Sequence, residues 1–236
     1  MIPGWLSEAA DYFWTMAGPP QASPRDLTSA APRGFVVDQQ IILGLCIDGI
    51  QRWFARRQCD VRFPEPDRGL RGCLTAVGGS AIIFIDGADG AAEHRFTFAH
   101  EIAHFLLDYR LPRDRAVKLL GPSILEVLDG IRRPTEAERL DAAINACPLG
   151  LHYHLLDRRE RTGHVSAVES KADQLACELL APDEELELRF GSRHLSVVEL
   201  SHELVQVFGL PLSEATRYST KWTRARQGPS PLVRIV

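Results

Sequence analysis

The pattern of apolar positions places a β-hairpin directly before a buried helix. Two short apolar runs, at residues 72–77 and 80–85, are joined by Gly78 and Gly79, a two-residue turn that is typical of hairpins. Helical spacing follows over about residues 92–108, and the centre of that segment is almost entirely apolar. A helix that is apolar on all sides is predicted to be buried.

Helical spacing predicts that most of the remaining chain is helical as well. Residues 1–34, which combine a short amphipathic helix with a Pro/Ser/Ala-rich stretch, are predicted to form an arm or linker. A single domain then spans residues 35–228, and residues 229–236 form a loose tail. The predicted fold class is α+β, mostly helical with a small antiparallel sheet. Further helices are expected near residues 36–57, 113–129, 134–147, 166–180, 196–208 and 213–224.

Composition narrows the class of protein. The chain has 236 residues and a formal net charge of −4, which suits one large domain and argues against general nucleic-acid binding. Its five cysteines include no Cys-x-x-Cys pair, so we expect neither a disulfide framework nor a cysteine-rich zinc module. Residues 1–18 carry acids and no Lys or Arg, unlike a signal peptide, and no apolar run is long enough for a membrane helix. We therefore expect a cytoplasmic protein.

The buried helix carries the motif His-Glu-x-x-His at residues 100–104. Residues four apart project from the same face of a helix, so the imidazoles of His100 and His104 can reach one metal ion. Glu101 points elsewhere and is suited to act as general base on a metal-bound water. Three titratable groups in one turn of an apolar helix would be costly without such a role.

A catalytic zinc of this kind needs a third protein ligand. Glu169 and Asp173 lie four apart on the helix predicted near residues 166–180, so Glu169 is a candidate ligand and Asp173 a candidate partner for a metal-bound histidine. Glu169 also fits a helix-capping box that starts at Ser166, which is the ordinary structural interpretation. The competing ligands are Asp108, His152, His154 and His164.

Two stretches resemble the ImmA/IrrE-type metallopeptidase family. Residues 95–107, RFTFAHEIAHFLL, resemble the active-site helix of that family, and residues 169–182, ESKADQLACELLAP, resemble its later Glu-x-x-Ala-Asn-x-Phe-Ala-x-x-Leu-Leu-x-Pro motif. The hairpin in front of the helix fits the layout too. The resemblance covers about residues 70–107 and 166–185 well, and about residues 36–69 and 194–222 loosely.

The resemblance implies a gluzincin-like, zincin-type core with one Zn²⁺ held by His100, His104 and Glu169. It also implies a peptidase that cleaves a helix-turn-helix transcriptional repressor and thereby relieves repression of stress or mobile-element genes. Two imidazoles and a carboxylate suit Mn²⁺ and Fe²⁺ as well as zinc. Asp173 stands where the family usually has Asn, and a carboxylate serves equally well as a hydrogen-bond acceptor for a histidine.

The chain departs from the family in the spacing between its two motifs. Sixty-five residues separate His104 from Glu169, so part of residues 109–165 is expected to be a helical insertion that covers the cleft or binds a partner. The helices near residues 196–222 carry only a modest basic content. We expect no direct DNA binding there.

The expected reaction is hydrolysis of a peptide bond, with Glu101 moving a proton from the attacking water to the leaving amine. The candidates for stabilising the oxyanion are Tyr109, His152, Tyr153, His154 and His164. An exposed edge of the 72–85 hairpin is expected to hold substrate as an added strand.

Two other functions are compatible with these residues. In the first, the metal is structural or vestigial, and the chain regulates a repressor by contact alone through the insertion and the Arg-rich residues 156–161. In the second, the protein is a zinc hydrolase of a non-protein amide. The effect of Glu101→Gln on the biological activity separates the first function from proteolysis.

Overall fold

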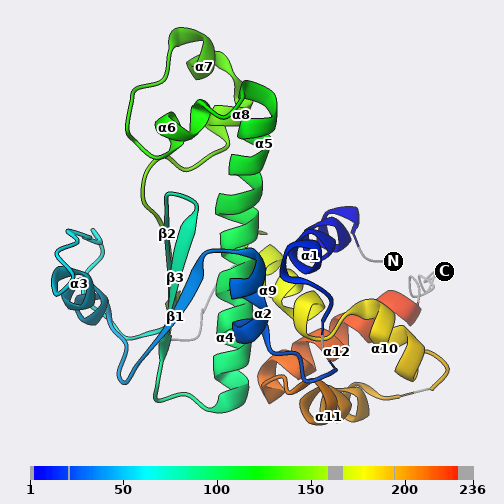
Figure 1. The fold of residues 1–236 in the computed structure, drawn as a ribbon. Helices are drawn as coiled ribbons and strands as arrows, with labels where there is room; N and C mark the ends of the chain where they lie inside the picture. The colour runs from blue at the N-terminus through cyan, green and yellow to red at the C-terminus, as the bar shows by residue number, and fades with distance from the viewer. Residues whose placement is uncertain (1–2, 21, 159–166, 194, 228–236) are drawn as a thin grey trace, which may run out of the picture.

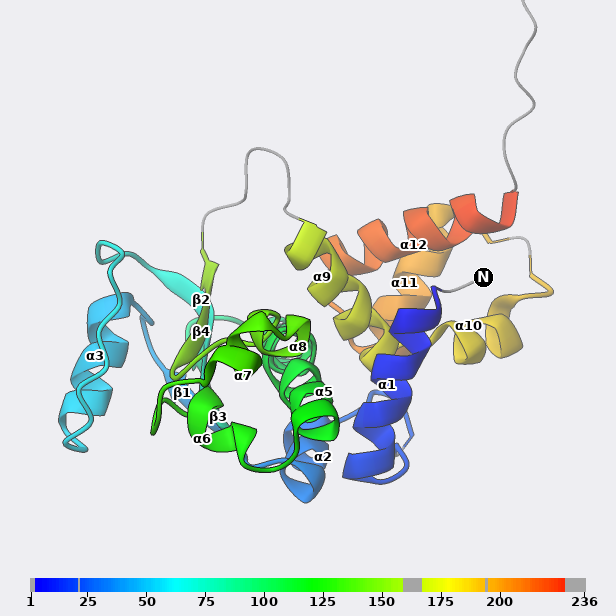
Figure 2. The same ribbon diagram turned by 90° about the horizontal axis from the view of Figure 1, so that it is seen from above.

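A computed structural model describes residues 3–20, 22–158, 167–193 and 195–227. Its centre is a four-stranded sheet in the order β1-β3-β2-β4, with a long helix, α4, lying along it (Figures 1 and 2). Strands β2 and β3 pair antiparallel, β4 pairs antiparallel with β2, and β1 pairs parallel with β3, so the sheet is mixed. The α+β, mostly helical fold class is confirmed. The strands are β1 (Val37–Ile42), β2 (Leu70–Val77), β3 (Ser80–Asp86) and β4 (His152–Asp157).

The predicted hairpin is strands β2 and β3. Gly78 and Gly79 form its turn with φ of 59° and 81°, left-handed values that a side chain would make costly. Helix α4 (Ala91–His104) follows, and it continues as a π-helical segment, η1 (Phe105–Arg110). Single π turns of this kind occur often next to functional sites.

The sheet separates two apolar clusters. Ile83 and Ile85 of β3 join the main core with α4, whereas Phe84 faces the opposite side and packs in a second cluster with residues of α3 (Ile47–Ala55). This alternation is what a strand buried on both faces requires. The sheet and the main core together support the helix that carries the His-Glu-x-x-His motif.

The single helix predicted over residues 36–57 is wrong. The structure has strand β1, then a turn at Gly44 with φ of 69°, then the shorter helix α3. Each β1 residue is in register with a residue of β3. This pairing is a tertiary interaction that overrides the helical spacing of the local sequence.

The N-terminal segment belongs to the main core and is not a linker. Helices α1 (Gly4–Ala17) and α2 (Leu27–Gly34) pack there through buried side chains such as Leu6, Phe13 and Leu27. The predicted amphipathic helix is therefore present as α1, and its apolar face packs against the main core. The side chain of Asp26 caps α2 by accepting hydrogen bonds from the backbone N–H groups of Thr28 and Ser29.

The expected insertion divides into a small helical lobe and a strand. Gly121, with a φ of 84°, interrupts the helix predicted over residues 113–129, and the extended backbone of Asp141, with a ψ of 127°, divides the helix predicted over residues 134–147. The lobe packs around its own apolar cluster, which includes Ile124, Val127 and Leu128. Strand β4, which was not predicted, follows it. The lobe helices are α5 (Leu111–Leu120), α6 (Ile124–Leu128), α7 (Glu136–Leu140) and α8 (Ala142–Asn145).

The C-terminal helices follow the predicted pattern, with one addition. Helix α9 (Ala167–Leu180) packs against α4, and α11 (Val197–Phe208) packs against α12 (Leu212–Gln227). The added helix is α10 (Asp183–Phe190). Within the described ranges, no helix is long and apolar enough to cross a membrane. The predicted tail at residues 229–236 lies outside the described residues.

Glu178 on α9 makes the stability depend on pH. Burial raises the pKa of this carboxyl to about 7, although the backbone N–H of Asp183 donates to it. The raised pKa means that the charge destabilises the folded state most above pH 7, and that this penalty disappears as the pH falls toward 4.5. We expect Glu178→Gln to raise the free energy of unfolding at pH 8 by about 2–3 kcal/mol, or the Tm by about 4–10 °C.

Thermal melts at pH 8 and pH 5 measure this effect, with Glu184→Gln on α10 as the control at an exposed carboxylate. A gain in Tm that is equal at both pH values would contradict the assignment to the charge of Glu178.

Candidate metal centre

Two imidazoles on α4 face each other in the interior of the protein. His100 and His104 are 2% and 1% exposed, and their Nε2 atoms are 3.2 Å apart. Their spacing of four residues puts them on one face of the helix, as expected from the sequence.

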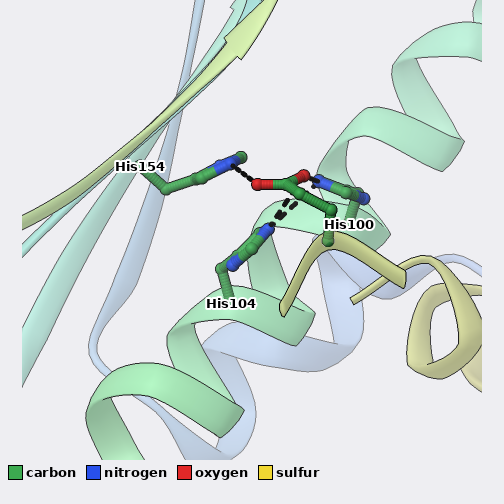
Figure 3. Close-up of side chains that lie close together, drawn as sticks. His100, His104 and His154 are labelled. Atoms are coloured by element: carbon green, nitrogen blue, oxygen red, sulfur yellow. Dashed lines mark hydrogen bonds and ion pairs between the residues drawn. The ribbon is translucent and has the colours of Figure 1, made fainter. Parts of the chain in front are cut away.

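Glu169 from α9 joins them. Its Oε2 atom lies 3.5 Å from Nε2 of His100 and 3.7 Å from Nε2 of His104. His154 approaches from β4, and ligand atoms of all four side chains lie within 4.8 Å of one another. Figure 3 shows the three histidines pointing toward one another, two from the helix and one from the strand.

The three atoms from His100, His104 and Glu169 fit a tetrahedral metal ion. Zinc binds imidazole nitrogen and carboxylate oxygen at about 2.0–2.2 Å, which places tetrahedral ligand atoms about 3.3–3.5 Å apart. The three distances here, 3.2, 3.5 and 3.7 Å, lie near this value. The three atoms thus lie close to the separations that one tetrahedral metal ion requires.

A carboxylate lies behind each of the two imidazoles. Oδ1 of Asp173 is 3.0 Å from Nδ1 of His100, and Oδ2 of Asp108 is 2.7 Å from Nδ1 of His104. Such pairs leave Nε2 as the lone-pair nitrogen and make it a better ligand. Asp173 therefore lies where its predicted role requires. Asp108, the competing third ligand in the sequence, faces the outer nitrogen of His104.

Glu101 lies on the other side of the cluster and is 0% exposed. Burial alone would raise the pKa of Glu101, but the charge and hydrogen bond of His154, together with the charges of His100 and His104, outweigh burial and lower the pKa. His154 donates from Nδ1 to Glu101 at 2.9 Å and from Nε2 to Glu169 at 3.0 Å. Burial lowers the pKa of His154, whereas the two carboxylates together raise it to about 10. The two carboxylates are thus held apart by one imidazolium ring.

Gly72 of β2 leaves the space in which Glu101 lies. Oε1 of Glu101 is buried and has no hydrogen-bond partner among the described residues. A Cβ at position 72 would come within 2.9 Å of that atom and within 2.6 Å of Cγ2 of Thr97. Only glycine lets β2 and α4 approach this closely.

We expect Gly72→Ala to lower the free energy of unfolding by about 1–3 kcal/mol, because β2 must move away from α4. Thermal unfolding measures this loss. Gly69→Ala is the matched control, because a Cβ there meets nothing within 4 Å. Thr97→Ser in the Gly72→Ala background removes the closest methyl group and should restore part of the stability. Equal Tm values for Gly72→Ala and Gly69→Ala would contradict the steric argument.

Tyr153 and Tyr109, two further candidates for stabilising the oxyanion, have other hydrogen-bond partners. Tyr153 is on the opposite face of the sheet, where its ring packs against Phe63 and its hydroxyl donates to Glu65. The hydroxyl of Tyr109 accepts the backbone N–H of Gly79.

His152 is two residues before His154 and so faces the same side as the cluster, stacked on the ring of Tyr109. Burial lowers the pKa of His152. His164 lies outside the described residues.

The hairpin has no open edge for a substrate strand, contrary to the prediction. In the order β1-β3-β2-β4, each hairpin strand already has a neighbour on its outer side. In the described part of the chain the outer edge of β4 is unpaired, and this strand carries His154. The strand order depends on pairings distant in sequence, so the hairpin signal alone did not reveal it.

Three features of the site carry only weak sequence signals. The position of His154 beside Glu101 depends on strand β4. This strand follows the helical lobe, and the local sequence there does not predict a strand. Asp108 is four residues after His104, the spacing of a helical pair, and this spacing indicates contact without indicating its role. Gly72 precedes an apolar run, where a glycine can mark a close approach of backbone.

The two histidines of the His-Glu-x-x-His motif and Glu169 from a later helix thus form a group that could hold a metal ion beside a small sheet. Residues 62–164, somewhat less than half of the chain, match the peptidase family model described as the IrrE N-terminal-like domain. The resemblance to the ImmA/IrrE family is thereby confirmed. The match includes His100, His104 and His154 and ends before Glu169. No curated protein and no solved structure gives a significant match to the chain.

Proposed function

We propose that the protein is a zinc-dependent endopeptidase. The observation that carries the proposal is the convergence of three ligand atoms, from His100, His104 and Glu169, at tetrahedral separations beside the buried carboxylate of Glu101. The matching peptidase family model supports the reaction class.

Each residue has a separate task in this proposal. When bound, zinc would lower the pKa of a water molecule and polarise the scissile carbonyl. Glu101 is ionised and takes the proton of the attacking water on Oε1, the oxygen without a protein partner, and then delivers it to the leaving amine. His154 fixes the other oxygen of Glu101 and supplies positive charge for the developing oxyanion.

The substrate is proposed to be an extended segment of a protein that pairs with the outer edge of β4. Backbone groups on an open strand bind peptides with little dependence on sequence, and side-chain pockets then select among them. The resemblance to ImmA/IrrE peptidases supports a helix-turn-helix repressor as this protein. A partially unfolded linker of such a repressor would meet the requirement for an extended chain.

Cleavage of a repressor tests this proposal. The purified zinc-loaded protein is incubated with a helix-turn-helix protein encoded beside its gene, and the products are measured by intact-mass spectrometry. Two fragments that sum to the substrate plus one water, absent with EDTA and with Glu101→Gln, are the expected result. A repressor that stays intact under all zinc-loaded conditions, together with a casein digest showing no peptides, would refute the peptidase.

One observation favours the alternative of a regulator that binds without cutting. His154 brings a fourth nitrogen to the cluster, and a closed four-ligand zinc site is typical of structural metal. In that function Glu101→Gln keeps the full biological effect and His154→Ala loses metal. In the peptidase, Glu101→Gln removes the effect.

A further inference from the structure

A cavity of about 190 Å³ lies between α1, α9 and α12. Asp173 is in its wall, and the same side chain contacts His100 of the metal cluster at 3.0 Å. The cavity is therefore one side chain away from the proposed metal site. The peptidase function described above gives it no role.

The interior of the cavity is apolar and aromatic. Leu6 of α1 and Cys177 of α9 are buried there, and the rings of Tyr218 and Trp222 come from α12. The hydroxyl of Tyr218 donates to the backbone oxygen of Ala181, so this ring offers its carbon surface. A flat apolar group fits such walls, since both aromatic rings are fixed by their own contacts.

The charged part of the lining is acidic. Four carboxylates line the cavity against two cations, which leaves an excess of two negative charges when all are ionised. The carboxylates belong to Asp173, Glu178, Asp183 and Glu214, and the cations to Arg217 and Lys221.

The two cations do not neutralise these carboxylates evenly. Arg217 forms an ion pair with Glu214 and lies 3.7 Å from Asp173. Asp173 also contacts His100. Glu178, only 7% exposed, accepts the backbone N–H of Asp183, and Arg25 attracts it more weakly. Of the buried carboxylates that line the cavity, Glu178 thus has the least positive charge nearby. A cation bound in the cavity would supply that charge.

We propose that this cavity binds a small organic cation, a primary amine on an aromatic or branched apolar body, with the ammonium group at Glu178 and the apolar body between Leu6 and the rings of Tyr218 and Trp222. The aromatic rings add a cation–π attraction. Burial raises the pKa of Glu178 to about 7, and a bound ammonium would lower it by stabilising the ionised carboxylate.

Ligand and metal affect each other through Asp173, a consequence that rests on the proposed metal site. A positive charge in the cavity, whose wall includes Asp173, weakens the support that this carboxylate gives His100. Metal at His100 in turn repels the ammonium. Since coupling between two sites is reciprocal, each ligand lowers the affinity of the other by the same factor.

Isothermal titration of the full chain at pH 8 tests the cavity, with 2-phenylethylamine as the probe. The neutral 2-phenylethanol and the anionic phenylacetate are its matched controls. We expect the amine to bind the metal-free protein at least about tenfold more tightly than either control. Glu178→Gln, which is expected to be the more stable protein, should weaken amine binding at least about fivefold.

A second variant tests the location. Ala225→Phe, at an exposed position of the cavity rim, fills the space and should abolish binding, whereas Ala55→Phe at an exposed position of α3 should leave it unchanged. Equal affinity for the amine and the alcohol, tighter binding of phenylacetate, or unaltered binding to Ala225→Phe would each overturn the proposal.

The metal-free titration separates this inference from the peptidase. A protein that binds the amine and never cleaves peptides would refute the proposed function and leave the cavity assignment standing. Saturating zinc should weaken amine binding at least about threefold in the wild type and leave it unchanged in His104→Ala. Identical affinities with and without zinc in the wild type would overturn the coupling.

Discussion

Glu101→Gln is expected to leave the protein folded and metal-loaded while it lowers the rate of peptide hydrolysis by about 10²–10⁴-fold, the usual contribution of a general base. Gln keeps the size of Glu and accepts a hydrogen bond from His154, but it takes no proton from water. Among the described residues, Oε1 of Glu101 has no hydrogen-bond partner and its other oxygen accepts from His154, so the metal content should stay near that of the wild type.

The rate is measured on a cleaved repressor or on casein, with metal content determined on the same preparation. Glu93→Gln in the first turn of the same helix is the control for losing one acidic charge. A Glu101→Gln protein that hydrolyses at the wild-type rate would remove Glu101 from its proposed role. A variant that has lost its metal would show that the carboxylate holds the site together.

Removal of the metal ligands should have the second-largest effect. We expect about one zinc per chain in the wild type, and substoichiometric zinc in both His104→Ala and Glu169→Ala, since three protein ligands hold a catalytic zinc and loss of one leaves a weak site. His154→Ala should retain the metal. Mass spectrometry of the metal, after dialysis of all four proteins against the same buffer, makes the comparison.

The pair Glu169→Ala and His154→Ala decides between two ligand sets. Metal lost from His154→Ala and kept by Glu169→Ala would transfer the third position to the histidine. Loss in both would indicate a closed site and favour the non-cutting regulator. A wild-type protein without metal after reconstitution with zinc would refute the peptidase.

The elements predicted correctly are those specified by local sequence. Gly78 and Gly79 mark the hairpin, and the apolar run around His100 specifies a buried helix, because turn chemistry and periodicity act over a few residues. The local sequence of strand β1 predicts part of a helix, because the strand is specified by its pairing with β3, about forty residues later. Strand β4 escaped prediction for the same reason, as it pairs with β2.

The sequence predicts the site residues that lie close together along the chain better than those that long-range pairing brings to the site. His100, Glu101 and His104 come from one helical turn, and the spacing of Glu169 and Asp173 put them on one face of a second helix. Several histidines lie between the two helices in the sequence. The register of β4 against β2, in which His154 lies opposite Leu74, determines which of them joins the cluster. No short-range pattern encodes that register.

The aromatic contacts of the N-terminal helices show that the segment shared with the family is smaller than the unit that folds. Phe13 of α1 stacks on Phe35, and Phe35 contacts Phe105 edge to face, directly after the turn that carries His100 and His104. A fragment trimmed to residues 62–164 would therefore expose the surface that α1 and α2 cover, and would lack Glu169. The ends of the segment that matches the family model therefore do not coincide with the ends of a domain that could fold on its own.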